Sequence, residues 1–114
     1  MIRVDRLNER LRFLKYGPEE YFRIHCDGQY RTPDDSERSF LTLQLYLGNN
    51  PDLRGGATRF WSPNMKNFID VRPLQGRVLI FQHNNLLHSG EEIVSGEKIT
   101  VRTDFMYERA ELST

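Results

Sequence analysis

Residues 39–47 read S-F-L-T-L-Q-L-Y-L, and this strict alternation predicts a β-strand with two different faces. One face is wholly aliphatic and predicts packing in a core between two sheets. Its members are Leu41, Leu43, Leu45 and Leu47. The other face mixes polar and aromatic side chains, which is typical of a strand that lines a functional cavity. Its members are Phe40, Thr42, Gln44 and Tyr46.

Short strand-like runs separated by turn residues recur on the C-terminal side of this segment. The predicted strands are Ala57–Trp61, Phe68–Arg72, Arg77–His83 and Lys98–Tyr107. The third of them, R-V-L-I-F-Q-H, is almost continuously apolar, as in a strand that is buried on both faces. The triplet Ser95-Gly96-Glu97 predicts a hairpin turn into the last strand.

On the N-terminal side, Leu7, Leu11 and Leu14 have helical spacing. We therefore expect a short helical or irregular lead-in that passes into a strand by Leu11. Many short strands with Gly, Pro and Asn turns favour a mainly β fold, a sandwich or barrel, and most simply a jelly roll.

The composition restricts the kind of protein. A chain of 114 residues suits one domain, residues 1–114. A formal net charge of zero predicts neither nucleic acid nor a membrane surface as a partner. The one cysteine, Cys26, indicates a reducing compartment, and no signal peptide or long apolar run is seen. We therefore expect a soluble protein of the cytoplasm or nucleus.

Two histidines and one aspartate form a candidate metal site. His25 and Asp27 occur in H-C-D, and residues two apart in a strand point to the same side. His88, in L-L-H-S-G after a predicted strand, lies in a short loop from which it can turn inward. Such a 2-His-1-carboxylate set is typical of Fe(II) oxygenases, although Zn²⁺ accepts the same ligand types. His83 competes for the third position, but we expect it to be a surface or strand-end histidine.

Two cations downstream offer an anchor for an acidic co-substrate. Lys98 and Arg102 are an even number of residues apart in a predicted strand, so they face the same side. Charged side chains on an otherwise apolar strand are unfavourable unless they are paired. The alternative is that this face is simply exposed to solvent.

Five blocks of sequence, in order, resemble the prolyl 4-hydroxylase-like Fe(II)/2-oxoglutarate dioxygenases. They are Y-G-P-E-E-Y-F-R-I-H-C-D-G, S-F-L-T-L-Q-L-Y-L, G-G-A-T-R-F, G-R-V-L-I-F-Q-H and H-S-G-E-E-I-V-S-G-E-K-I-T-V-R-T-D-F-M-Y. The resemblance runs from about Leu11 to Tyr107. It implies a double-stranded β-helix of the cupin-like kind, with residues 1–114 as the C-terminal core of the dioxygenase domain. The family's helices that precede the H-x-D region have no counterpart in this sequence.

The resemblance also implies roles for individual residues. Iron would be held by His25, Asp27 and His88, and Lys98 would pair with the distal carboxylate of 2-oxoglutarate. Two further residues match family positions near that co-substrate, namely Tyr16 and Thr58. Arg102 stands where relatives often carry a smaller residue, and it is the alternative anchor. Some relatives have a second tyrosine where this chain has Leu45.

The implied activity is hydroxylation of a C–H bond with release of succinate and CO₂. Fe(II) would be the cofactor, 2-oxoglutarate and O₂ the co-substrates, and L-ascorbate an additional candidate. The substrate would be a protein, a peptide or a small molecule, with prolyl residues as the family-level expectation. Two loops, Gly28–Arg38 and Asn49–Gly55, are expected to select it. The competing interpretations are a truncated, non-catalytic jelly-roll module and a cupin-like metal enzyme that does not use 2-oxoglutarate.

Overall fold

A computed structural model describes residues 1–48 and 50–110, and the described residues form eleven β-strands and no helix. The strands are β1 (Ile2–Leu7), β2 (Arg12–Tyr16), β3 (Phe22–His25), β4 (Glu37–Leu47), β5 (Arg54–Gly55), β6 (Thr58–Trp61), β7 (Phe68–Val71), β8 (Val78–Gln82), β9 (His88–Gly90), β10 (Ile93–Ser95) and β11 (Lys98–Arg109). The described residues therefore contain no helix that is long and apolar enough to cross a membrane.

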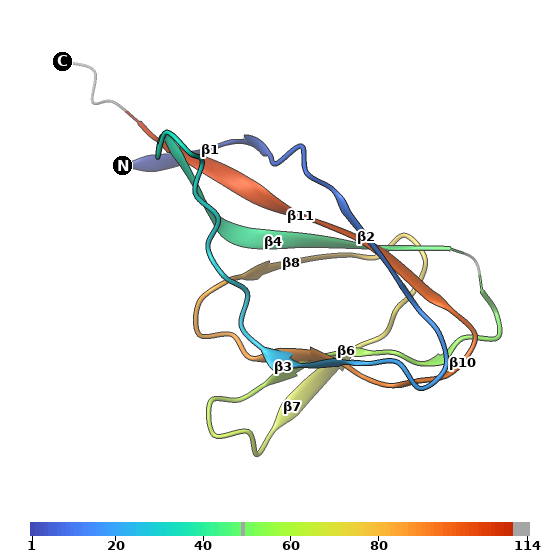
Figure 1. Ribbon diagram of the computed structural model, residues 1–114. Coiled ribbons are helices and arrows are strands. Elements are labelled where there is room, and N and C mark those ends of the chain that lie inside the picture. The colour runs from blue at the N-terminus through green and yellow to red at the C-terminus, as the bar shows by residue number, and fades with distance from the viewer. Residues whose placement is uncertain (49, 111–114) are drawn as a thin grey trace.

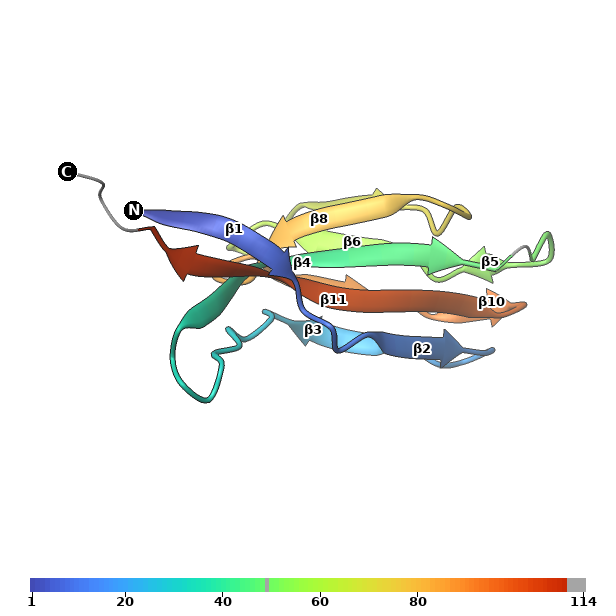
Figure 2. The same ribbon diagram turned by 90° about the horizontal axis from the view of Figure 1, so that it is seen from above.

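The strands form two sheets that face each other (Figures 1 and 2). The major sheet has the order β1-β11-β4-β8, and β2 also pairs with β11. The minor sheet has the order β3-β9-β6-β7, and a separate two-stranded ribbon joins β5 to β10. All of these pairings are antiparallel, and sequence neighbours repeatedly lie in opposite sheets. This arrangement confirms the predicted jelly roll, a double-stranded β-helix.

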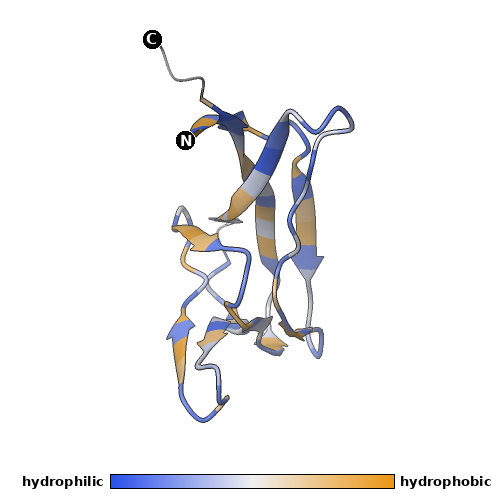
Figure 3. Ribbon diagram, turned by 90° about the vertical axis from the view of Figure 1, so that its left-hand side faces the viewer, coloured by the Kyte–Doolittle hydropathy of each residue, from blue (hydrophilic) through white to orange (hydrophobic). Residues whose placement is uncertain are grey.

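The long strand β4 confirms the alternation predicted from S-F-L-T-L-Q-L-Y-L but corrects the assignment of its faces. Thr42, Gln44 and Tyr46 of the polar and aromatic face are buried and face the opposite sheet as a cavity lining should, whereas Phe40 is only half-buried. The expected burial of the leucine face between the sheets is wrong, because Leu47 is exposed and the other three leucines are only half-buried. The reason is that the leucines point outward from the major sheet. Bands of hydrophobic residues therefore alternate with polar ones along the strands (Figure 3).

Strand β8 shows the same outward apolar face, which corrects the prediction that Arg77–His83 is buried on both sides. Its residues Val78 and Ile80 pair in register with Leu45 and Leu43 of β4 and so share their face. They are 49% and 55% exposed, whereas Phe81, which points inward, is buried. A continuous apolar run does not reveal that one of its faces lies on the outside of a two-sheet fold.

The N-terminal segment also differs from expectation. In place of a helical or irregular lead-in, I-R-V-D-R-L forms strand β1 along the C-terminal half of β11. The helical spacing of the leucines has no structural counterpart, since Leu7 is 46% and Leu11 52% exposed. Strand β2 begins at Arg12, close to the predicted start.

The turn at Ser95-Gly96-Glu97 is present, but it does not close a hairpin. It connects β10, which pairs with β5, to β11 in the major sheet. Gly96 has a φ of +81°, and a Cβ at this position would lie 2.8 Å from the Cα of Leu53. A glycine is therefore required where the chain crosses from one sheet to the other.

Candidate metal centre and its two cavities

The two histidines of the candidate site are direct neighbours across the minor sheet. His25 ends β3 and His88 begins β9, and the two residues are register partners. Partners in an antiparallel pair point to the same face, so both rings face the interior, with their centroids 4.2 Å apart. The sequence placed His88 in a loop, but it lies in a strand, and that strand pairing fixes its distance from His25.

Asp27 completes the cluster from just beyond the end of β3. Its Oδ1 atom lies 3.3 Å from Nε2 of His25 and 3.3 Å from Nε2 of His88. One ligand atom from each of the three residues lies within 4.8 Å of the others. The side chains of Asp27 and His88 are 8% and 5% exposed, whereas that of His25 is 25% exposed. Cys26, between the first two residues, is exposed.

Hydrogen bonds orient all three side chains toward one point. Nδ1 of His25 lies 2.6 Å from the carbonyl oxygen of Arg23, and Nδ1 of His88 lies 3.2 Å from that of Leu86. A ring whose Nδ1–H donates to a carbonyl presents its Nε2 lone pair on the other side. Both Nε2 atoms are buried and have no hydrogen-bond partner among the described residues.

The carboxylate of Asp27 is held by a residue that the sequence had assigned to the cavity face without giving it a role. The hydroxyl of Thr42, on β4, donates a hydrogen bond of 2.7 Å to Oδ2 of Asp27. The other oxygen, Oδ1, is therefore left facing the two imidazoles. Two unpaired imidazole nitrogens and one carboxylate oxygen, all buried and aimed at one another, are a donor set that fits a divalent metal.

The electrostatic environment favours the protonation states that metal binding needs. Burial opposes ionisation of Asp27, but the neighbouring His88 ring, the Thr42 hydroxyl and the charge of Arg102 outweigh it, so the pKa of Asp27 lies well below its ordinary value. Burial also lowers the pKa of His25. At neutral pH the site therefore presents a carboxylate and, at His25, a neutral imidazole, as metal ligation requires.

A small cavity of about 30 Å³ adjoins the two histidines and holds the predicted cationic anchor. Lys98 is 5% exposed, and its Nζ donates to the carbonyl oxygen of Gly56 at 2.9 Å and lies 4.9 Å from the ring centroid of Tyr16. Burial lowers the pKa of Lys98 to about 8. Because 30 Å³ accommodates only about two water molecules, a five-carbon diacid would enter only after side chains around Lys98 move.

The other residues predicted around the co-substrate lie at the same cavity. Tyr16, Thr58 and Arg102 all line it. Thr58 is already engaged in a buried hydrogen-bond network, because Gln44 donates to its hydroxyl at 3.2 Å and the hydroxyl of Tyr46 lies beside it. The sequence placed Gln44 and Tyr46 on the cavity face but did not indicate this network.

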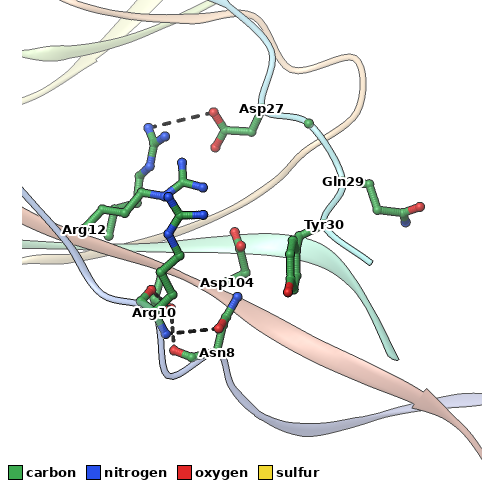
Figure 4. A pocket seen from close by; sticks show the side chains of 10 residues that line it. Asn8, Arg10, Arg12, Asp27, Gln29, Tyr30 and Asp104 are labelled. Atoms are coloured by element: carbon green, nitrogen blue, oxygen red, sulfur yellow. Dashed lines mark hydrogen bonds and ion pairs between the residues drawn. The ribbon is translucent and has the colours of Figure 1, made fainter. Parts of the chain in front are cut away.

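A second and larger cavity of about 310 Å³ adjoins Asp27. Asp27 and Arg102 stand at its boundary, and Nη1 of Arg102 lies 3.9 Å from Oδ1 of Asp27 (Figure 4). Gly28, Gln29 and Tyr30, from the first loop predicted to select the substrate, line this cavity. Asn49, the first residue of the second such loop, lies outside the described residues.

His83, the alternative ligand, lies away from the cluster. It is 1% exposed, so it is not a surface histidine, but it does stand at a strand end, directly after β8. Its Nδ1 lies 3.4 Å from the hydroxyl of Ser39, and its Nε2 lies 3.4 Å from a carboxylate oxygen of Asp104. His83 thus connects β4 and β11 and does not point at Asp27.

Residues 11–106 match the 2OG-Fe(II) oxygenase superfamily. A search of curated protein sequences found no match.

Among solved structures, the chain is similar to a prolyl-4-hydroxylase from Pseudomonas putida, with 24% identity over 88% of this chain and 52% of that one and a TM-score of 0.61. It is also similar to a viral collagen prolyl hydroxylase from Paramecium Bursaria Chlorella virus-1, with 23% identity over 93% of this chain and 62% of that one and a TM-score of 0.65. A third similar structure is an oxidoreductase of the 2OG-Fe(II) oxygenase family from Burkholderia pseudomallei, with 13% identity over 96% of this chain and 45% of that one and a TM-score of 0.66. The chain therefore spans about half the length of these proteins, and at such identities the likeness shows the fold.

Proposed function

Because the chain belongs to the 2OG-Fe(II) oxygenase superfamily, we propose that it binds Fe(II) and 2-oxoglutarate and hydroxylates a C–H bond of an organic substrate. When bound, the metal would activate O₂ and couple the decarboxylation of 2-oxoglutarate, which yields succinate and CO₂, to that hydroxylation. The protein would supply the metal ligands, an anchor for the co-substrate and a site that is shielded from water.

One observation carries the proposal. Two buried Nε2 atoms, on His25 and His88, have no hydrogen-bond partner among the described residues and face the same oxygen of Asp27. Unpaired buried polar atoms are unfavourable, and two of them directed at one carboxylate oxygen are explained by a metal ion that all three residues bind. This set leaves the side toward the cavities open for further ligands.

We assign the 2-oxoglutarate anchor to Lys98. It is the more deeply buried of the two candidate cations and has no carboxylate partner among the described residues, whereas Arg102 lies 3.9 Å from Asp27. An ammonium group whose pKa is lowered by burial gains strongly from a carboxylate that reaches it. Tyr16 and Thr58 would complete the contacts around the co-substrate.

For the substrate, we propose a chemical class and no individual compound. Two of the similar structures are named as prolyl hydroxylases, so prolyl residues in a protein or peptide are the first substrates to test. A small-molecule substrate is the alternative. A requirement for L-ascorbate stays a prediction.

The decisive experiment is anaerobic titration of the chain with Fe(II) and 2-oxoglutarate, followed by visible absorption. We expect a metal-to-ligand charge-transfer band that disappears in Asp27→Ala and that needs at least about 30-fold more 2-oxoglutarate in Lys98→Met. Asp5→Ala, an exposed aspartate on β1, should retain the band and serves as the matched control. Admission of O₂ with a prolyl peptide should then release succinate in proportion to the hydroxylated product.

Two results would contradict the proposal. A chain that binds Fe(II) but gives no band with 2-oxoglutarate would favour a cupin-like metal enzyme. A chain that binds neither would favour a non-catalytic jelly-roll module. Binding of Zn²⁺ alone decides nothing, because the same three ligands suit zinc.

A further inference from the structure

The larger cavity is suited to the organic substrate by its position. Its volume is about 310 Å³, against about 30 Å³ for the cavity around Lys98, and the two cavities share Arg102. His25 and His88 line the smaller one, and Asp27 lines the larger one. A molecule in the larger cavity would therefore reach the metal cluster beside Asp27, whereas one beside Lys98 would reach it at the two histidines.

Three arginines converge on this cavity. Arg12 on β2 is the register partner of Arg102 on β11, so the two side chains project from the same face of neighbouring strands. Arg10 joins them from the segment between β1 and β2 (Figure 4). Like charges directly opposite each other in a sheet repel. The arrangement therefore has an electrostatic cost that an anion between the arginines would remove.

Two of the three arginines, Arg10 and Arg12, have no ion-pair partner among the described residues. Arg102 has Asp27, at 3.9 Å, and Asp104 lies 3.4 Å from Nε2 of His83. No carboxylate of the described chain forms an ion pair with Arg10 or Arg12. If Asp27 coordinates a metal ion, as the proposed function requires, its negative charge is shared with that cation and the positive charge around the cavity increases.

The backbone that carries Arg10 is held in place. The amide of Arg10 donates to Oδ1 of Asn8 at 3.0 Å, and its carbonyl accepts a hydrogen bond of 3.1 Å from the Thr103 hydroxyl. Asn8 is itself 7% exposed, and its amide donates to the carbonyl of Asp104 at 2.8 Å. Arg10 is thus an exposed guanidinium on a segment that is fixed to β11.

We propose that this cavity binds the organic substrate through a carboxylate of the substrate, which Arg10 and Arg12 hold. A guanidinium forms two parallel hydrogen bonds with a carboxylate, and such charge-assisted pairs are strong and directional. Across the cavity, Tyr30 is 38% exposed and offers an aromatic surface to the body of the substrate. The carboxylate is either that of a small free acid or the side chain of an acidic residue in a peptide. The proposal rests on the proposed function for the identity of the reaction, but the binding step is separable from turnover.

The test compares charged and neutral ligands of the same shape. The small pair is N-acetyl-L-proline and N-acetyl-L-prolinamide, and the peptide pair is acetyl-Ala-Pro-Glu-Ala-amide and its Gln counterpart. The protein is saturated with Zn²⁺ and 2-oxoglutarate, so that the cavity around Lys98 is filled, and binding is followed by NMR at the arginine Nε–H groups. Each measurement is repeated with Arg10→Gln/Arg12→Gln and with the control Arg72→Gln, an exposed arginine that does not line the cavity.

We expect at least one acid to bind about tenfold more tightly than its neutral counterpart, which is the size of effect that charge-assisted hydrogen bonds give. The preference should vanish in Arg10→Gln/Arg12→Gln and persist in Arg72→Gln. Selective binding of the small acid would identify a free acid as substrate, and selective binding of the glutamyl peptide an acidic peptide. Because the double variant removes two exposed charges that repel Arg102, we expect its melting temperature not to fall.

Equal binding of acid and neutral forms, absence of binding by all four probes, or a preference that survives in the double variant would overturn the inference. These outcomes are distinct from failure of the proposed function. A charge-transfer band with Fe(II) and 2-oxoglutarate but no charge preference would remove the carboxylate inference alone. A charge preference without the band would leave an anion site beside a metal site and remove the dioxygenase.

Discussion

Replacement of Lys98 by methionine tests whether this lysine stabilises the fold or destabilises it and serves to bind 2-oxoglutarate. Lys98 is 5% exposed, and burial lowers its pKa from 10.5 to about 8. The unfolded chain keeps the proton up to about pH 10.5, whereas the folded protein loses it near pH 8. Between these values the unfolded state binds more protons, so the contribution of Lys98 makes the free energy of unfolding rise with pH.

The size of the effect follows from the same shift. A change of the pKa from 10.5 to about 8 corresponds to about 3 kcal/mol, since one pKa unit is about 1.4 kcal/mol. Methionine removes this penalty but also removes the hydrogen bond from Nζ to the carbonyl of Gly56, which is worth about 1 kcal/mol. We therefore expect Lys98→Met to be more stable than the parent by roughly 2 kcal/mol at pH 7.

The assay is chemical denaturation of parent and variant at pH 7 and pH 10. The advantage of the variant should shrink as the pH rises, and the comparison between the two proteins cancels the titration of other groups. The affinity for 2-oxoglutarate should fall by at least about 30-fold, because truncation of one member of a buried charge pair costs about 2 kcal/mol or more. Lys15→Met, on the neighbouring strand with a side chain that is 65% exposed, is the matched control and should change neither property markedly.

Two results would refute this reasoning. If Lys98→Met is less stable than the parent at pH 7, the lysine contributes to the fold and is not a group kept at a cost to stability. If the variant binds 2-oxoglutarate as tightly as the parent does, the anchor lies elsewhere.

Three further predictions concern the metal site, the pH dependence and the sheet faces. Thr42→Val should weaken Zn²⁺ binding about 10- to 100-fold by removing the hydrogen bond that leaves one oxygen of Asp27 free for the metal; an unchanged affinity in a competition titration would contradict it. The dissociation constant of 2-oxoglutarate should increase as the pH rises above about 8, because Lys98 then loses its proton, and calorimetry that finds a flat profile up to pH 10 would disprove this. Phe13→Ser, at a residue that is 66% exposed, should change the free energy of unfolding by less than about 0.5 kcal/mol. Met106→Ala, at a residue that is 0% exposed, should lower the free energy of unfolding by about 2–5 kcal/mol. Similar losses in both variants would show that the outer face of the major sheet is buried, against this prediction.

Much of the architecture could be predicted because strand structure is encoded locally. The period of two in S-F-L-T-L-Q-L-Y-L identified β4 and its two faces, and it placed Thr42, Gln44 and Tyr46 on the cavity side. The same period placed Lys98 and Arg102 on one face of β11, and both line the cavity beside the histidines. A period is a property of neighbouring residues and needs no knowledge of the rest of the chain.

What the sequence by itself determined is therefore the set of strands around the site and the identity of the three residues that converge there. It did not determine which apolar faces lie outside, as Val78 and Ile80 do, because exposure depends on what packs against a sheet. Nor did it reveal that Thr42 holds Asp27 or that Arg12 stands opposite Arg102, since both facts arise from the pairing of strands far apart in the chain. Only the tertiary structure decided these contacts, because strand register and sheet packing are set by the free energy of the whole fold and not by any one segment.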